Sequence, residues 1–178
     1  MALDRLRPWL DARDRAGAAA AAADAEEPAE VEATRQRDHT VIVGYGRIGH
    51  WIGEALSKAG VPLFVIDEKD DIVDRLKARN IEAVAGYAPG ILRAANLAQA
   101  KALLVALPEA FEAGQVVAQA RAANRELFIV AHAHSDAEAA YLSNYGASAV
   151  VQGAREIADA MVAQLPTPPS AMHLAQGS

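Results

Sequence analysis

A glycine motif placed directly after a short apolar run constrains this chain more than any other feature. Residues 40–43 are Thr-Val-Ile-Val, and the pattern G-x-G-x-x-G follows with its glycines at Gly44, Gly46 and Gly49. A strand, a glycine turn and a helix in this order are typical of a dinucleotide-binding unit. The apolar residues that recur at helical spacing after the motif are Ile48, Ile52, Ala55 and Leu56.

Each glycine has a steric reason in such a turn. Gly44 permits the tight turn out of the strand, Gly46 lets a pyrophosphate approach the backbone, and Gly49 lets the helix pack close to the strand. The free N–H groups and the positive end of the helix attract a phosphate. We therefore expect a phosphate-binding turn. The alternative is a fold of the same type whose glycines serve packing alone and whose pocket is empty.

An acidic residue completes the fingerprint at the end of a second apolar run. Residues 62–66 are Pro-Leu-Phe-Val-Ile, and Asp67 follows them. Asp67 lies close to the interval of about 20 residues after the motif at which an acid binds a ribose hydroxyl. A carboxylate here repels a 2′-phosphate, so the sequence favours NAD or another adenosine nucleotide over NADP.

The composition bounds the remaining possibilities. The chain has 178 residues, enough for one domain with tails, and 52% of them are hydrophobic. It has no cysteine, which excludes disulfides, thiolate nucleophiles and cysteine metal sites. A net charge of −6 argues against a nucleic-acid partner. The absence of a membrane-spanning run and of an apolar signal core predicts a cytoplasmic location.

Strand and helix patterns alternate from residue 40 to about residue 165. We expect an α/β fold: one Rossmann-like domain with a doubly wound, parallel, six-stranded sheet in the order 3-2-1-4-5-6. Ser135 is a plausible N-cap for the helix that ends near Gly146. The strands are expected at residues 40–43, 62–67, 82–85, 102–107, 127–131 and 147–151.

The two ends of the chain differ from the middle. Residues 1–38 combine a basic amphipathic helix, expected over residues 3–15, with an Ala/Glu-rich linker. The helix either packs on another surface or lies at a membrane surface with Trp9 at the interface. We assign residues 39–165 to the folded domain and expect the Pro-containing tail, residues 166–178, to be disordered.

Short motifs in this order resemble the N-terminal nucleotide-binding lobe of the regulators of potassium conductance, the TrkA-N domain. The version attached to Kef-type and YbaL-type monovalent cation:proton antiporters is the most similar. The resemblance covers roughly residues 40–165. The segments that carry it are residues 41–49, 65–67 and 86–88, Leu107-Pro108 with Glu112-Ala113-Gly114, and residues 153–158.

The resemblance implies a set of nucleotide-binding residues. Arg47 matches a basic residue near phosphate, Asp67 matches the ribose-binding acid, and Tyr87 matches a position beside adenine where relatives carry Asp or Asn. A tyrosine there could stack on the base instead of hydrogen-bonding it. The full set is Gly44, Tyr45, Gly46, Arg47, Ile48, Gly49, Asp67, Glu68, Gly86, Tyr87, Ala88, Leu107 and Pro108.

The family likeness also implies a function. Such a domain is not an enzyme: it follows the transmembrane antiporter domain at the inner face of the cell membrane and gates potassium or other monovalent cation transport. The implied ligand is NAD(H), AMP or another adenine nucleotide. The last helix, with Glu156, resembles a segment that pairs subunits, so a homodimer is expected. We expect a fragment of a longer antiporter, with a stand-alone protein acting in trans as the alternative.

Two other functions remain open at this stage. A small NAD-dependent oxidoreductase needs a proton donor near the nicotinamide, and no tyrosine after Tyr45 is followed by a lysine four residues later. A purely structural dimerisation domain would not bind nucleotides.

His132, where relatives carry Arg, and His134 share a strand face. We interpret them as exposed loop histidines, with a metal site involving Asp136 and Glu138 as the less favoured alternative.

Overall fold

Six parallel strands form a single sheet in the computed structural model, which describes residues 33–165. The strand order is β3-β2-β1-β4-β5-β6, so the predicted doubly wound topology is confirmed. The order reverses between β1 and β4, which places a crevice at the carboxyl ends of these two strands. The strands are β1 His39–Val43, β2 Leu63–Asp67, β3 Glu82–Ala85, β4 Ala100–Val105, β5 Phe128–Ala133 and β6 Ala149–Gln152.

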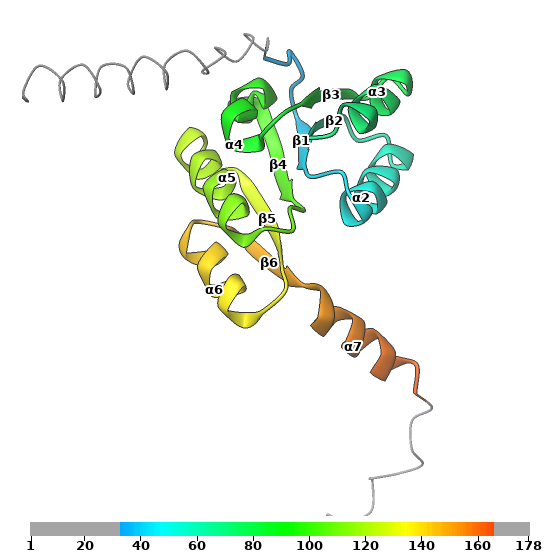
Figure 1. Ribbon diagram of the computed structural model, residues 1–178, viewed down its shortest axis with the longest axis vertical. Coiled ribbons are helices and arrows are strands. Elements are labelled where there is room, and N and C mark those ends of the chain that lie inside the picture. Colours follow the sequence, from blue (N-terminus) through cyan, green and yellow to red (C-terminus); the bar gives the residue numbers. More distant parts are fainter. Residues whose placement is uncertain (1–32, 166–178) are drawn as a thin grey trace, which may run out of the picture. The chain divides into compact units, whose positions relative to one another are not determined.

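Helices cover both faces of the sheet (Figure 1). α2 and α3 lie on one face, and α4, α5 and α6 lie on the other. This follows from right-handed crossovers that run in opposite directions from the centre of the sheet. The helices are α2 Arg47–Lys58, α3 Asp70–Ala78, α4 Ala88–Ile91, α5 Ala110–Ala123, α6 Asp136–Asn144 and α7 Gly153–Ala163, with short 3-10 helices η1 Leu92–Ala95 and η2 Leu97–Gln99.

The central strands form the core because they are covered on both sides. Every residue of β1 is buried, and so are the first four residues of β2. The one ionisable side chain in β1, His39, is buried, and its Nε2 lies 2.8 Å from the carbonyl oxygen of Ala95. Its Nδ1 has no hydrogen-bond partner among the described residues, so the contact with Ala95 offsets only part of the cost of burying the ring.

The predicted apolar face of the first helix is only partly correct. The buried residues of α2 are Gly49 and Gly53, whereas Ile48 and Ala55 are exposed. A Cβ at Gly53 would lie 2.4 Å from the hydroxyl oxygen of Tyr45. Ile52 and Leu56 are partly buried and pack against the core as predicted, and the closest approach of the helix is made by its glycines.

Several boundaries also differ from the predictions. β4 begins at Ala100 and ends at Val105, because its pairing with β1 starts at His39 and Ala100. The segment between β3 and β4 contains the two short helices α4 and η1 in place of one longer helix. Ser135 does cap α6: its Oγ accepts a hydrogen bond from the backbone N–H of Glu138 at 3.2 Å.

The predictions for both chain ends lie outside the described residues. These are the amphipathic helix at residues 3–15, most of the linker and the tail at 166–178. Within residues 33–165, no helix is long and apolar enough to cross a membrane.

Candidate functional site

The turn between β1 and α2 requires two of its three glycines for the fold itself. Gly44 has a φ of 86°, and its N–H donates to the carbonyl oxygen of Ile66 at 2.9 Å. A Cβ at Gly49 would lie 2.0 Å from the carbonyl oxygen of Gly44. Gly46 differs, because a Cβ there would have no described atom within 4 Å. The backbone at Gly46 is thus open to an approaching ligand.

The N-terminus of α2 suits an anion. Gly46 is its N-cap and supplies no side-chain cap, and the first turn contains no acidic residue. The N–H groups of this turn therefore keep their partial positive charge unneutralised by side chains. Arg47, the first residue of α2, is exposed beside the turn and adds a full positive charge. These features fit a phosphate group.

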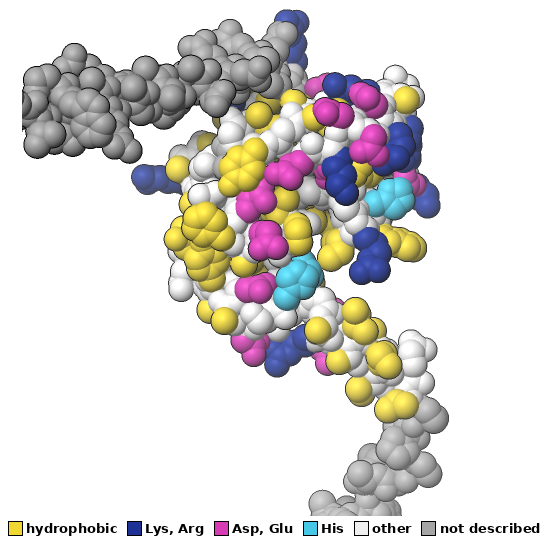
Figure 2. Space-filling model, in the orientation of Figure 1, with side chains coloured by type: hydrophobic (Ala, Val, Ile, Leu, Met, Phe, Trp, Pro, Cys, Tyr) yellow, Lys and Arg dark blue, Asp and Glu magenta, His cyan; other side chains and the backbone are white. Residues whose placement is uncertain are grey.

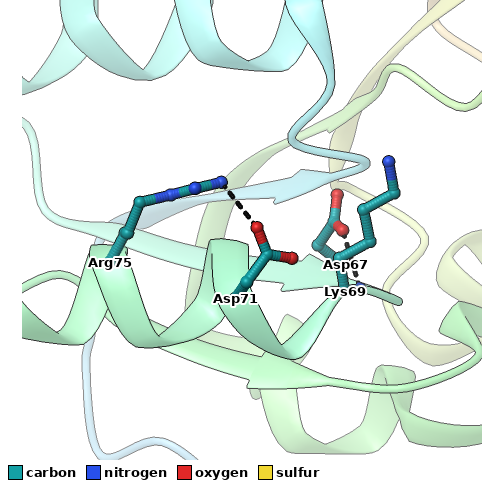
Figure 3. A network of polar contacts seen from close by, with 4 residues as sticks. All are labelled: Asp67, Lys69, Asp71 and Arg75. Carbon is teal, nitrogen blue, oxygen red and sulfur yellow. Dashed lines mark hydrogen bonds and ion pairs between the residues drawn. The ribbon is translucent and has the colours of Figure 1, made fainter.

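The carboxylate of Asp67 connects the end of β2 to the glycine turn. Its Oδ2 accepts a hydrogen bond from the N–H of Tyr45 at 2.6 Å, and its Oδ1 accepts one from the N–H of Lys69 at 2.9 Å. Figure 3 shows the carboxylate at the end of the strand next to α3. Each oxygen has further lone-pair capacity, and Asp67 is only partly buried. The carboxylate is therefore oriented and still able to accept ribose hydroxyls.

Tyr45 contributes to the turn through its backbone. Its side chain is 6% exposed, and its ring makes an edge contact with His50 at a centroid distance of 5.8 Å. Burial raises the pKa of the Tyr45 hydroxyl, with Arg79 opposing and Glu54 adding to the shift. Among the described residues, the hydroxyl has no hydrogen-bond partner.

The other predicted contacts lie at the ends of β3 and β4. Gly86 has a φ of 144°, and its N–H donates to the carbonyl oxygen of Asp67 at 3.0 Å. Tyr87 is half exposed, and its hydroxyl donates to Oε1 of Gln115 at 3.0 Å. Ala88 and Leu107 are buried, whereas Pro108 and Ile48 are exposed. A hydrogen-bonded Tyr87 ring offers a fixed flat surface at the crevice.

Three acidic residues interact beyond the carboxyl ends of β2 and β4. Burial raises the pKa of the Glu112 carboxyl, and repulsion from Glu68 and Glu109 adds to the shift. Its Oε1 is buried and has no partner within the described part of the chain. Sequence reasoning named Glu68 but missed Glu109 and Glu112 as site candidates. The signal was available, because all three carboxylates follow the carboxyl ends of strands that meet at one edge of the sheet.

The two histidines at the end of β5 lie together, as their spacing predicts. The rings of His132 and His134 meet edge to face at a centroid distance of 4.5 Å. Burial lowers the pKa of His132, His134 lowers it further, and Glu138 opposes the shift. No group of three or more His, Cys, Asp or Glu residues within 33–165 could hold a metal ion. The structure thus lends no support to the alternative metal site.

The chain is similar to proteins of known family. The sequence model of the TrkA-N domain matches residues 40–153. Escherichia coli (strain K12) YbaL, named as a cation/proton antiporter, is 44% identical over 135 residues, which are 75% of this chain and 24% of YbaL. The crystal structure of the YbaL TrkA-N domain has a TM-score of 0.72 at 42% identity, covering 75% of this chain and 100% of that domain. The chain thus spans about a quarter of its YbaL relative.

Two more distant structures share the fold. The C-terminal domain of Kef from Shewanella denitrificans, solved in an AMP-bound form, has a TM-score of 0.61 at 24% identity over 72% of this chain and 82% of that one. The GsuK channel bound to NAD has a TM-score of 0.61 at 18% identity over 84% of this chain and 27% of that one. At these identities the likeness concerns the fold alone. The family match, which covers more than half of the chain, decides the assignment: this chain belongs to the TrkA-N domain family.

Proposed function

We propose that this domain binds an adenine nucleotide, NAD(H) or AMP, and regulates a monovalent cation:proton antiporter. The observation that carries the proposal is the hydrogen bond between the Asp67 carboxylate and the N–H of Tyr45. It sets a ribose-binding acid directly beside an uncapped helix N-terminus, which is the arrangement that a nucleoside phosphate needs. The names and contents of the relatives, an antiporter and structures holding AMP or NAD, support the same proposal.

The proposed nucleotide lies across the carboxyl ends of β2, β1 and β4. Its phosphate contacts the turn at Gly46 and Arg47, and its ribose contacts Asp67. Tyr87 borders the adenine, and Leu107 and Pro108 border the other half of a dinucleotide. A bound nucleotide regulates only by binding one domain arrangement more tightly than another.

The proposed partners are an antiporter membrane domain and a second copy of this chain. α7 has no buried residue, and its apolar side chains are exposed. Those of α7 are Ile157 at 63%, Met161 at 68% and Val162 at 65% exposure, and Leu165, just after the helix, is 66% exposed. A contiguous exposed apolar surface of this kind favours a protein interface. We place the domain at the inner face of the membrane, in the same chain as the antiporter or in trans.

We further propose that the domain is not an enzyme. The tyrosine hydroxyls are occupied or withdrawn: that of Tyr45 is buried under α2 and that of Tyr87 is bonded to Gln115. Tyr141 and Tyr145 contact each other on α6 at a ring-centroid distance of 4.6 Å. None is a free proton donor beside the expected nicotinamide position, which a reductase requires.

Isothermal titration of the purified protein with AMP, ATP, NAD, NADH and NADPH tests the proposal. We expect binding by at least one adenosine ligand and weaker binding of NADPH, because Asp67 repels a 2′-phosphate. Binding by none of the five would reject nucleotide regulation and favour a structural dimerisation domain. Oxidation of NADH in the presence of small carbonyl compounds would instead revive the oxidoreductase alternative.

A further inference from the structure

A second pocket lies beside the glycine turn, on the face of the sheet covered by α2 and α3. It has a volume of about 420 Å³, within the range of small-molecule sites. The α4–α5 face, which carries Tyr87, is on the other side of the sheet (Figure 1). The lining residues are Tyr45, Gly46, Arg47, His50, Ile72, Arg75, Leu76 and Arg79.

The floor of this α2–α3 pocket is apolar. It consists of the Tyr45 ring, which is held in place by packing against Gly53 and His50, together with Ile72 and Leu76. Tyr45 and Leu76 are almost fully buried, so the floor is rigid rather than collapsible. Such a surface suits a flat or aliphatic body, which gains free energy by leaving water.

The rim of the pocket is basic. Arg47 and His50 come from α2, Arg75 comes from α3, and Arg79 directly follows α3. Figure 2 shows basic and acidic side chains interspersed in the region of α3. Among the described residues that line the pocket there is no carboxylate. The rim therefore selects against cations and favours an anionic group.

The arginines Arg75 and Arg79 differ in their availability. Arg79 is engaged with Glu54 of α2 at 2.6 Å, and this hydrogen-bonded contact lowers the pKa of the Glu54 carboxyl. Within residues 33–165, the one ion pair of Arg75 is with Asp71, one turn earlier, at 3.0 Å (Figure 3). Both side chains of that pair are more than two thirds exposed, and such surface pairs contribute little. Arg75 can therefore turn toward a ligand at small cost.

We propose that the α2–α3 pocket binds an organic phosphate, with its carbon body on Tyr45 and Leu76 and its phosphate between Arg47 and Arg75. Guanidinium groups hold phosphate oxygens by paired, charge-assisted hydrogen bonds, and the N-terminus of α2 adds its partial positive charge. This site goes beyond the nucleotide site proposed above, although the two share the turn at Gly46. The phosphate belongs to a molecule separate from the nucleotide, because Asp67 repels a 2′-phosphate on an adenosine nucleotide bound in the crevice.

Nuclear magnetic resonance titration of the full chain with phenyl phosphate tests the pocket directly. We expect backbone amide shifts at residues 45–50 and 72–79, and about tenfold weaker binding by Arg75→Gln. Lys77→Gln removes the same charge from α3 at a position outside the pocket and should bind as the unaltered chain does. Shifts that spare α3, or equal affinity for the two variants, would overturn the proposal.

Two further titrations identify the source of the phosphate and separate this site from the nucleotide site. Binding of phenyl phosphate in the presence of saturating AMP indicates a separate organic phosphate. Displacement of phenyl phosphate by 2′-phosphoadenosine 5′-phosphate, with an Arg75-dependent affinity, would place the phosphate on the nucleotide and overturn the assignment to a separate molecule. The affinities for AMP and NAD are expected to be equal in Arg75→Gln and in the unaltered chain. A chain that binds phenyl phosphate but neither AMP nor NAD would therefore contradict the proposed nucleotide site and leave the pocket proposal standing.

Discussion

At the scale of single residues, Asp67 has a structural role and a proposed binding role, and its substitution can distinguish the two. Its two carboxylate oxygens orient the backbone at Tyr45, where the hydrogen bond is partly buried, and at Lys69, where it is exposed and water can replace it. We expect Asp67→Ala to fold and to bind AMP or NAD about 1 to 3 kcal/mol more weakly, measured by calorimetry. Asp74→Ala, which removes an exposed carboxylate from α3, is the matched control. Equal affinities for the two variants would mean that the ribose lies elsewhere.

Substitutions at Gly46 and Gly49 are predicted to have different effects, the first on nucleotide binding and the second on stability. A side chain at Gly46 meets only open space, so Gly46→Val should keep its melting temperature and lose nucleotide binding. A side chain at Gly49 would collide with the backbone of Gly44, so Gly49→Ala should lower the free energy of unfolding by about 1 to 3 kcal/mol. Thermal unfolding and calorimetry on both variants distinguish the two effects. Normal nucleotide binding by Gly46→Val would contradict the proposed phosphate position.

His132 should titrate below the ordinary histidine pKa of about 6.5, because burial and His134 disfavour its charged form. A lowered pKa in the folded state means that the unfolded chain binds the proton more readily. The stability of the fold therefore falls as the pH drops below about 6.5 toward the folded-state pKa. The groups that face the ring are His134, Glu138 and the first residue of α7, Gly153.

Proton resonances of the imidazole ring give the midpoint for His132 directly. Urea unfolding at pH 7.5 and pH 5.5 should show a smaller loss of stability for His132→Asn than for the unaltered chain. His134→Asn serves as the comparison, since His134 is more exposed. A midpoint above the ordinary value would contradict the burial argument.

At the scale of whole elements, α7 is unlike the other helices because it has no buried residue. We expect Met161→Asp to convert a dimer into a monomer, because a charge in an apolar interface is costly. Ala163→Asp places the same side chain about 200° around α7 from Met161 and should leave the dimer intact. Sedimentation analysis of both variants gives the association state. A monomeric unaltered chain would contradict the proposed pairing.

The predictions of helices and strands were incomplete where an element depends on strand pairing or helix packing with residues far away in the sequence. The alternation of apolar runs and helical stripes was sufficient to predict six parallel strands, since parallel strands need helical crossovers, and the dinucleotide-binding motif predicted their order. It could not predict that α2 packs through Gly53, because a glycine carries no hydrophobic signal. The start of β4 at Ala100 likewise depends on its partner β1.

At the scale of the described domain, nucleotide binding should raise thermal stability. A ligand that binds only the folded state stabilises it by about 2.7 kcal/mol at a concentration of 100 times its Kd. We therefore expect AMP or NAD to raise the melting temperature in a concentration-dependent way, and Asp67→Ala to reduce that shift. A melting temperature that is independent of every adenosine nucleotide would favour a structural dimerisation domain.

The sequence by itself determined the topology and the location of the nucleotide crevice. The positions of Gly44, Gly46, Gly49 and Asp67 relative to two apolar runs were enough, because strand ends, a helix start and an acid at fixed spacing meet at one edge of a parallel sheet. The direction in which each side chain points could not be predicted from these motif positions. Tyr45, for example, lies next to the turn in sequence, yet its ring is buried under α2.

Only the tertiary structure decided which side chains from different elements share a pocket. The grouping of Arg47 with Arg75, the approach of Glu68 to Glu112 and the contact of His132 with α7 all join residues that lie far apart along the chain. The physical reason is that helix orientation on a sheet depends on close contacts such as those of Gly49 and Gly53. Periodicity specifies which residues share a helix face, whereas packing determines what that face meets.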